Sequence, residues 1–317
     1  MKSILLLLLA SITLWANAHI FVYHRFGDSR HLSTNTTIEQ LRAEFEYFKT
    51  NGYEVIPLEK LVTALKERKE ISDKWVVLTI DDNFKSFYTN ALEIFKEYNY
   101  PFTVFVYVEA TQKGYPDYMT WEQLRETQKY GGIEFHSYGH GHLTQMNNDE
   151  IREDFDKGMA LFEKEMGVRP KYFTYPYGEF SPRVKEAVKA YEFAAIINQN
   201  MGAVSKFSDV YDLDRTALVG KSNLKQYLKY RSLQANWKKP TLFPADSVLK
   251  TLYVETNEKS KSGGVAISGH DWMPAKLKGG DFKMEFNKKL TKKRTRIVIS
   301  VGNKISTKLL IKDKYGN

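Results

Sequence analysis

The sequence predicts an α/β domain, a distorted (β/α) barrel, followed by a small all-β module. Short β-prone runs alternate with amphipathic helical stretches as far as about residue 235, which is typical of parallel strands joined by helical crossovers. After Pro240 the helical patterns stop, and short β-prone segments separated by Gly, Asn and Lys follow. The charge changes at the same place: residues 238–317 hold 18 Lys and Arg against 7 Asp and Glu, and the rest of the chain holds 29 against 31.

The barrel is expected over residues 19–237. Its helical stretches carry apolar residues at spacings of three and four, and its strands are short runs rich in Val, Ile, Phe and Tyr. The expected strands are residues 20–24, 75–80, 102–108, 132–135, 172–175 and 193–197, with 212–218 as a further candidate. The expected helices are residues 38–50, 58–68, 84–98, 149–166 and 182–191. Chemistry on such a barrel lies at the carboxyl ends of the strands.

Residues 238–317 are expected to form a small sandwich. Its expected strands are residues 249–256, 264–268, 282–286, 296–301 and 305–313. Lys-rich turns such as 288-KKLTKKRTR are typical of a charged face that contacts only water, and contact with an anionic cell-envelope polymer is the alternative. These basic runs contain no interleaved aromatic residues, which argues against nucleic acid as a partner.

The segment 1–18, MKSILLLLLASITLWANA, follows the pattern of a secretory signal peptide. A basic residue precedes an apolar run, and Ala16-Asn17-Ala18 supplies small residues where a signal peptidase cleaves. We therefore expect an exported protein, in the periplasm or outside the cell, that begins at His19 and is not an integral membrane protein after cleavage. The alternative is an uncleaved N-terminal anchor.

Polar residues directly follow several of the expected barrel strands. Asp81 and Asp82 come after the run of residues 75–80, and 136-HSYGH comes after residues 132–135. Because the carboxyl ends of parallel strands meet on one rim of a barrel, we expect two carboxylates and several imidazoles to converge there.

His136, His140 and one carboxylate form a candidate metal site. The chain has no cysteine, so the available side-chain ligands are His, Asp and Glu. Two imidazoles four residues apart, together with one Asp, make a facial set suited to Zn²⁺ or another divalent first-row ion with positions left for water. The alternatives are two turn histidines and, for Asp81-Asp82, a turn or a helix N-cap.

Three segments resemble the motifs of polysaccharide deacetylases, the NodB-homology group of carbohydrate esterase family 4. The segment 78-LTIDDN resembles their T-F-D-D motif, and 136-HSYGHGHL matches their H-[ST]-x-x-H-x-x-L motif. The segment 173-FTYPYGE resembles a third motif with Pro-Tyr-Gly at its core, in a form similar to that of exported poly-N-acetylglucosamine deacetylases. The segment 21-FVYHRF is similar to the family's first strand, and the resemblance covers roughly residues 19–235.

The resemblance implies a role for each matched residue. Asp82, His136 and His140 would bind a divalent metal, expected to be Zn²⁺, with Co²⁺, Ni²⁺ or Fe²⁺ as alternatives. Asp81 would be the general base that takes a proton from the attacking water. The backbone N–H of Tyr177 would stabilise the oxyanion, where each donor is worth roughly 3–4 kcal/mol.

One departure from the family concerns the support of the general base. The third motif usually carries an Arg before Pro-Pro-Tyr, and this Arg normally holds the base carboxylate, whereas Thr174 and Tyr175 stand here. Arg215, in 212-DLDRTAL, is the candidate replacement from another strand, and Arg25 is the alternative.

A second departure concerns the general acid. The family uses a late Leu-x-His motif, and the only late histidine of this chain is His270, within the expected β module. His24 and His142 are the alternatives. Pro176 and Tyr177 are expected to contact the substrate, and His24 is a third candidate for that contact.

These features predict an exported, metal-dependent hydrolase of carbon–nitrogen bonds other than peptide bonds. It would remove N-acetyl groups from an N-acetylglucosamine-containing polysaccharide and release acetate. The alternatives are a glycan-binding protein with a degenerate deacetylase site and a metal amidohydrolase for small N-acyl or cyclic amides. A glycosidase ranks last, because Asp81 and Asp82 are adjacent whereas a glycosidase needs two carboxyls on opposite sides of the bond.

Overall fold

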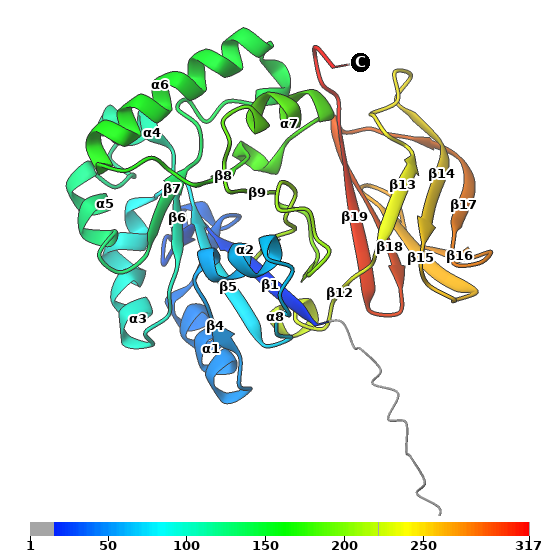
Figure 1. The fold of residues 1–317 in the computed structure, drawn as a ribbon, viewed down its shortest axis with the longest axis horizontal. Helices are drawn as coiled ribbons and strands as arrows, with labels where there is room; N and C mark the ends of the chain where they lie inside the picture. Colours follow the sequence, from blue (N-terminus) through cyan, green and yellow to red (C-terminus); the bar gives the residue numbers. More distant parts are fainter. Residues whose placement is uncertain (1–15, 221, 317) are drawn as a thin grey trace, which may run out of the picture.

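The computed structural model describes residues 16–220 and 222–316, which form two domains side by side (Figure 1). The signal peptide expected over residues 1–18 lies almost wholly outside the described residues. Within the described residues, no helix combines the length and the apolar character that crossing a membrane requires.

The first domain is an incomplete parallel barrel. Its sheet runs in the order β10-β1-β5-β6-β7-β8-β9. The strands are β1 (Asn17–Tyr23), β5 (Trp75–Asp81), β6 (Thr103–Val106), β7 (Gly132–Phe135), β8 (Tyr172–Thr174), β9 (Ala195–Ile197) and β10 (Val204–Ser205). All the neighbours on this path are parallel except β10, which is antiparallel to β1.

A short segment spans the gap between the first and last barrel strands. Ile197 of β9 bridges Leu213, and β11 (Thr216–Ala217) pairs with Phe21 and Val22 of β1. This is the distorted barrel that the alternation of strands and helices predicts. The candidate strand at residues 212–218 contributes to it by these few pairs.

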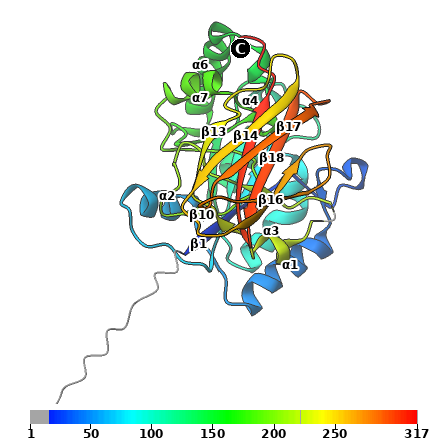
Figure 2. The ribbon, with the colours of Figure 1, turned by 90° about the vertical axis from the view of Figure 1, so that its right-hand side faces the viewer.

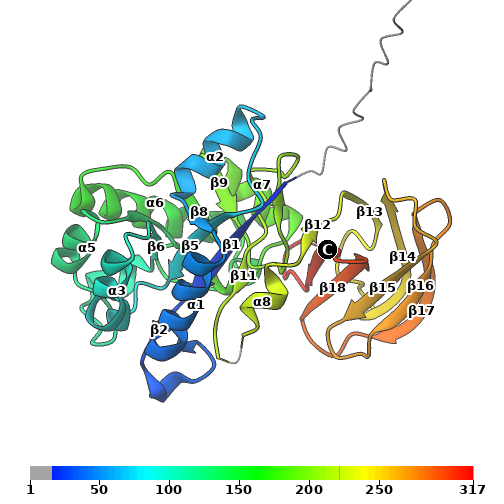
Figure 3. The ribbon, with the colours of Figure 1, turned by 90° about the horizontal axis from the view of Figure 1, so that it is seen from below.

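Helices surround the barrel sheet, as the view from below shows (Figure 3). The five expected ones are α1 (Ile38–Thr50), α2 (Leu58–Lys66), α3 (Leu92–Glu97), which follows a π-helical turn at Phe87–Ala91, α6 (Asn148–Met166) and α7 (Pro182–Lys189). Three more were not expected: α4 (Val108–Gln112), α5 (Trp121–Thr127) and α8 (Leu224–Tyr227). At 5, 7 and 4 residues they are too short to display a clear helical period.

Small elements complete the barrel domain. They are β2 (Arg25–Phe26), β3 (Asn35–Thr36), β4 (Glu54–Val55) and 3-10 turns at Ser29–His31, Leu143–Gln145 and Pro176–Gly178. Nearly every residue of β1 and β5 is buried, because a parallel strand inside a barrel is covered on both faces. The continuous apolar run at residues 75–80 follows from that burial.

The second domain is a sandwich of two sheets, seen with the barrel behind it in Figure 2. The sheets have the orders β12-β19-β18-β15-β16 and β13-β14-β17. The strands are β12 (Arg231–Ser232), β13 (Ala235–Lys239), β14 (Val248–Thr256), β15 (Ser262–Ile267), β16 (Met273–Lys276), β17 (Phe282–Lys289), β18 (Arg294–Val301) and β19 (Lys304–Ile311). The core between the sheets includes Leu252, Val265 and Ile297.

Both predicted domain limits fall inside strands. The limit between residues 237 and 238 lies within β13, which pairs with β14 of the sandwich. The predicted first residue, His19, lies within β1, whose Asn17 and Ala18 pair with Ser205 and Val204. Strand pairing sets these limits, with the next strand for β13 and with a distant segment for β1, and a local change of composition does not reveal it.

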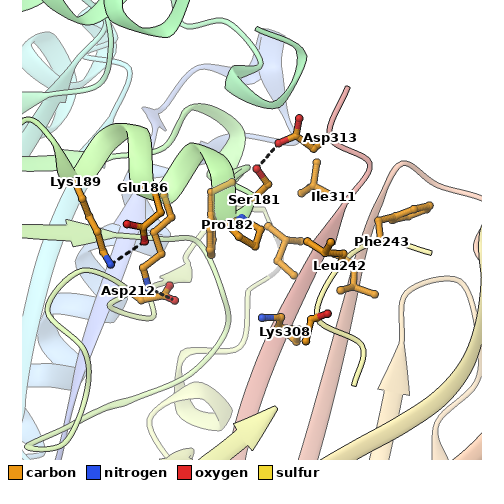
Figure 4. A pocket seen from close by; sticks show the side chains of 15 residues that line it. Ser181, Pro182, Glu186, Lys189, Asp212, Leu242, Phe243, Lys308, Ile311 and Asp313 are labelled. Atoms are coloured by element: carbon orange, nitrogen blue, oxygen red, sulfur yellow. Dashed lines mark hydrogen bonds and ion pairs between the residues drawn. The ribbon is translucent and has the colours of Figure 1, made fainter. Parts of the chain in front are cut away.

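The outer face of β18 and β19 packs against the barrel. The Thr307 hydroxyl donates a 2.7 Å hydrogen bond to the Met201 carbonyl, and Asp313 contacts Ser181 and forms a 2.9 Å ion pair with Arg183. A cavity of about 240 Å³ remains at this junction, lined in part by Lys308 and Leu242 (Figure 4). The two domains are therefore joined by polar contacts as well as by the chain itself.

Candidate active site

The carboxyl ends of β5, β7 and β8 bring the motif residues together. Asp81 is the last residue of β5 and Asp82 follows it, while His136 directly follows β7. Tyr177 lies in the 3-10 turn two residues after β8 ends. The convergence on one rim that the sequence predicts is therefore present.

Asp82, His136 and His140 form a compact group of ligand atoms. One such atom from each residue lies within 4.8 Å of the other two. The Nε2 atoms of His136 and His140 are 3.3 and 2.9 Å from Asp82 Oδ1. Even so, this buried oxygen accepts no hydrogen bond from any described residue. Ligand atoms that crowd together without hydrogen-bonding one another are arranged as they would be around a shared cation.

The surroundings of His136 leave one ring nitrogen available. His136 Nδ1 is 2.7 Å from the carbonyl of Thr174, which favours the tautomer with the proton on Nδ1 and a free lone pair on Nε2. Burial alone would raise the pKa of Asp82, but His136 and His140 outweigh it and hold that pKa well below its usual range. An ionised carboxylate and two imidazoles fit Zn²⁺ and related divalent ions.

Arg215 holds the neighbouring carboxylate of Asp81. Its Nη1 and Nη2 atoms donate to the two Asp81 oxygens at 2.7 and 2.6 Å, and its side chain is completely buried. Burial tends to raise the pKa of Asp81, but the Arg215 charge outweighs this tendency and the pKa is lowered. Arg25, the alternative support, pairs with Asp28 at 2.9 Å.

Tyr177 has a left-handed backbone conformation inside the 3-10 turn. Its φ is +58°, in the left-handed region, and among the described residues no acceptor pairs with its N–H. Its side chain is 43% exposed and stacks on His142 with ring centroids 4.2 Å apart. Pro176 of the same turn is buried, so Tyr177 is the residue of this pair that a substrate can contact.

Comparison with known proteins identifies the domain that carries this site. A family model described as polysaccharide deacetylase matches residues 68–196, which include Asp81, Asp82, His136, His140 and Tyr177. The chain contains a polysaccharide deacetylase domain. The expected enzyme class, a hydrolase of carbon–nitrogen bonds other than peptide bonds, is the class of this family.

Two curated relatives match the deacetylase domain. A Bacillus subtilis (strain 168) protein named as a polysaccharide deacetylase, YxkH, is 23% identical over 201 residues, covering 63% of this chain and 71% of the relative. The poly-β-1,6-N-acetyl-D-glucosamine N-deacetylase of Escherichia coli (strain K12) is 23% identical over 246 residues. That match covers 63% of this chain but 36% of the Escherichia coli enzyme.

A solved structure supports the same fold. The Streptococcus pyogenes deacetylase PplD in complex with acetate matches with a TM-score of 0.60 at 20% identity, covering 65% of this chain and 94% of that one. At this identity the likeness shows the fold of the deacetylase domain alone.

Backbone strain in the deacetylase domain is concentrated at this site. Eight described residues of this domain other than glycine have a positive φ, and five of them are at this site: Asp82, Asn83, Ser137, His140 and Tyr177. Each of these five lies at or just beyond the end of β5, β7 or β8. Such conformations cost of order 1–3 kcal/mol each and persist where the surrounding structure enforces them.

Hydrogen bonds from side chains with no predicted catalytic or metal-binding role hold these turns. The Asn83 side chain accepts from the Tyr107 N–H at 2.8 Å and donates to Thr111 at 2.8 Å. The Ser137 hydroxyl accepts from the His140 N–H at 2.9 Å. Asp154 of α6 accepts from two further amides of the same loop. Ser137 is a defined position of the second motif, whereas Asp154 has no local sequence signal because it acts from a separate helix.

The three candidate acids lie in different surroundings. His24 is buried, and its Nδ1 has no partner among the described residues. Its pKa is lowered, because burial outweighs the opposing charges of Asp82 and Asp81. His142 bonds to Glu179 at 2.7 Å. His270 lies in the sandwich, where its Nε2 is 3.1 Å from the Lys289 carbonyl. The fold thus brings His24 to the carboxylates and leaves His270 in the other domain.

Proposed function

We propose that this chain is an exported, metal-dependent enzyme that removes N-acetyl groups from an N-acetylglucosamine-containing polysaccharide. The observation that carries the proposal is the cluster of Asp82, His136 and His140, whose ligand atoms lie within 4.8 Å of one another. Beside it, Asp81 is held ionised by Arg215. A base next to a metal site is what hydrolysis by an activated water requires.

The residues of the site act on an acetamido group in a defined order. A divalent ion held by Asp82, His136 and His140 would polarise the carbonyl and lower the pKa of water towards about 7. Asp81 takes a proton from the water as its oxygen attacks the carbonyl carbon. The Tyr177 N–H stabilises the oxyanion, and the carbon–nitrogen bond then breaks to release acetate and an amine.

We infer that His24, in place of His270, donates the proton to the leaving nitrogen. Burial lowers the pKa of His24, and the charges of Asp82 and Asp81 act against that shift, which places His24 near both carboxylates; its Nδ1 is unpaired within the described residues. His270 keeps its place in the sandwich, bonded to the Lys289 carbonyl. A general acid must reach the leaving atom within hydrogen-bond distance, so position decides between the two.

The nature of the relatives supports the glycan as substrate. The Escherichia coli relative is named for poly-β-1,6-N-acetyl-D-glucosamine, and the exposed ring of Tyr177 beside the metal cluster suits stacking on a sugar. Export rests on the signal-peptide pattern of residues 1–18.

An acetate-release assay tests the proposal. Purified protein is incubated with N-acetylglucosamine oligomers and with peptidoglycan, with and without a chelator and after Zn²⁺ is added back. We expect acetate from the Zn²⁺-loaded protein, loss of activity on chelation, and at least a hundredfold lower kcat for Asp81→Asn. Glycan binding without acetate release would instead indicate a binding protein, and acetate from small N-acyl compounds alone would indicate an amidohydrolase.

A further inference from the structure

Two arginines of the sandwich face the deacetylase domain. In the β18–β19 register, Arg294 is opposite Ile311 and Arg296 is opposite Leu309, so the two side chains share one face of the sheet. Arg296 Nη2 donates a 2.8 Å hydrogen bond to the Gln199 carbonyl of the barrel. This face is therefore the one that packs on the barrel.

A cavity of about 380 Å³ lies where these arginines meet the barrel. Arg294, Arg296 and Val298 line it from the sandwich, and Gln199 and Tyr227 are among the residues that line it from the barrel. Its volume is within the range of sites for small ligands, and it is large enough for a sugar ring or a charged substituent.

The charges in this cavity are not balanced. The Nε atoms of Arg294 and Arg296 are buried and without a hydrogen-bond partner among the described residues, and no described carboxylate lies within 4.0 Å of either guanidinium. Burial and the charge of Arg294 lower the pKa of Arg296 to about 10. Two half-buried like charges with no carboxylate at ion-pair distance are costly, and an anion between them would lower that cost.

The other cavity at the domain junction differs in this respect (Figure 4). There Lys185 pairs with Asp212 at 2.9 Å and Lys189 pairs with Glu186 at 3.0 Å. Lys308 also lines that cavity, but so do the carboxylates of Glu186, Asp212 and Asp313, whereas no described Asp or Glu lines the Arg294–Arg296 cavity.

The Arg294–Arg296 cavity adjoins the oxyanion turn. Gly178 lies so close to Gln199, a lining residue, that a Cβ at Gly178 would collide with the Gln199 side chain. The charge of Glu179 opposes the lowering of the pKa of both arginines, so Glu179 lies near them. Glu179 also bonds to His142, whose ring stacks on Tyr177. Contacts thus run without a break from the cavity to the turn that carries the oxyanion donor.

We propose that Arg294 and Arg296 form a subsite for an anionic group of the glycan, a carboxylate or a phosphate, next to the acetamido group that is hydrolysed. The inference rests on the proposed deacetylase function and makes its substrate an acidic N-acetylated polysaccharide. The planar forks of two guanidinium groups match the oxygens of a carboxylate or a phosphate. The sandwich thereby contributes to substrate choice, while the barrel carries out the chemistry.

The test compares matched oligosaccharides on the full chain loaded with Zn²⁺. The substrates are a neutral N-acetylglucosamine oligomer, an N-acetylated oligomer bearing carboxylates, its methyl ester, and an oligomer bearing phosphate monoesters. We expect the protein to prefer an acidic oligomer over both neutral ones. In Arg294→Gln/Arg296→Gln, kcat/KM on that acidic oligomer should fall at least tenfold and kcat/KM on the neutral oligomer should stay unchanged. The acidic oligomer that responds identifies the anion.

The control variant is Lys292→Gln/Lys293→Gln, which removes the same charge from two exposed residues directly before Arg294. It should leave unchanged the ratio of kcat/KM on each acidic oligomer to kcat/KM on the neutral oligomers. Equal activity on acidic and neutral oligomers, or an equal loss on both in the arginine variant, would overturn the subsite. Thermal unfolding gives a second readout: the carboxylated or the phosphorylated oligomer should raise the Tm of the native chain and not that of the arginine variant.

Failure of the deacetylase proposal can be told apart from failure of the subsite. If no oligomer releases acetate, calorimetric titration of the same four oligomers still tests the cavity. Tighter binding of an acidic oligomer that the arginine variant loses supports the subsite, and equal binding of all four oligomers overturns it.

Discussion

Asp81 keeps its charge at a buried position because one residue compensates for the loss of water. Arg215 donates to both carboxylate oxygens, and Arg215 in turn bonds to the Thr79 hydroxyl and the Asn198 carbonyl at 3.0 and 3.1 Å. The plane of the carboxylate is therefore fixed before a substrate binds. A base that is already ionised and oriented needs no rearrangement during the reaction.

Replacing Arg215 should change the pH dependence of the reaction. Arg215→Lys loses the paired hydrogen bonds that the guanidinium donates to both Asp81 oxygens. The effect of burial on Asp81 then prevails, so its pKa rises and less of the base is ionised at a given pH. We expect kcat/KM for acetate release to fall at least tenfold and its acid limb to move to higher pH. Arg25→Lys, which alters the pair with Asp28, should leave the midpoint of that limb in place. A shift in both variants, or in neither, would contradict the assignment.

His19 should make the fold sensitive to mild acid. Burial, aided by the charge of Arg231, lowers the pKa of His19 from 6.5 to about 4. The unfolded chain binds a proton near pH 6.5 and the folded chain does not, so the free energy of unfolding falls as pH drops from 6.5 to 4. The contribution is roughly 3 kcal/mol, at 1.36 kcal/mol per pKa unit.

The check is denaturant unfolding between pH 7.5 and pH 4 for the native chain and for His19→Gln. The variant should show the smaller loss of stability in this interval. His31→Gln, at a side chain that is 44% exposed, serves as the control and should follow the native curve. Parallel curves for His19→Gln and the native chain would refute the prediction.

Among the elements, α6 supports the metal site from outside it. Its Asp154 accepts hydrogen bonds from the N–H groups of Tyr138 and Gly139 at 2.9 and 2.7 Å. These amides lie between His136 and His140, in a loop whose Ser137 and His140 are both left-handed. The helix thus helps to hold the spacing of these two candidate ligands, which follow β7.

Removing that support should weaken metal binding without removing a ligand. For Asp154→Ala we expect at least a tenfold loss of Zn²⁺ affinity, because the loop amides lose their acceptor and the ring of His140 is no longer held in place. Competition with a chromophoric chelator measures the affinity. Glu153→Ala, an exposed neighbour on the same helix, should keep native affinity. Native affinity in Asp154→Ala would show that the loop holds its shape alone.

At the scale of the whole molecule, the sandwich contacts the barrel next to its catalytic rim. Asp313 follows β19 and is buried against the barrel, where it binds Arg183 and Ser181. Burial would raise the pKa of Asp313, but Arg183 and Ser181 outweigh it and lower that pKa. The position of Arg294 and Arg296 beside Gln199 depends on this junction.

Breaking the junction should lower the stability of the full chain. Asp313→Ala removes a buried carboxylate that holds both Arg183 and Ser181, and we expect the free energy of unfolding to fall by about 2–3 kcal/mol. Denaturant unfolding at pH 7 measures the change. Lys312→Ala, at the exposed preceding residue, should cost less than about 0.5 kcal/mol. Equal stability of the two variants would mean that Asp313 does not couple the domains.

The sequence predicts the repeating part of the fold better than its short elements. Helix α1 has the expected bounds of residues 38–50, because its apolar period runs for its full length. Helix α5 was missed although Thr120 and Gln123 form a capping box, since seven residues hold too little of the period. For the general acid, the sequence points to His270, with His24 and His142 as alternatives, whereas the fold brings His24 to the carboxylates.

The sequence by itself determined the class of fold and predicted the candidate metal ligands and base, because each of these depends on residues that are neighbours in one strand end or one turn. Asp81 and Asp82 are adjacent, and His136 and His140 share a single loop. The tertiary structure decided that Arg215 and not Arg25 holds Asp81, a contact between residues 134 positions apart. It also decided that two arginines of the sandwich adjoin the oxyanion turn. Contacts of this kind depend on how whole elements pack, and no local pattern of residues records that packing.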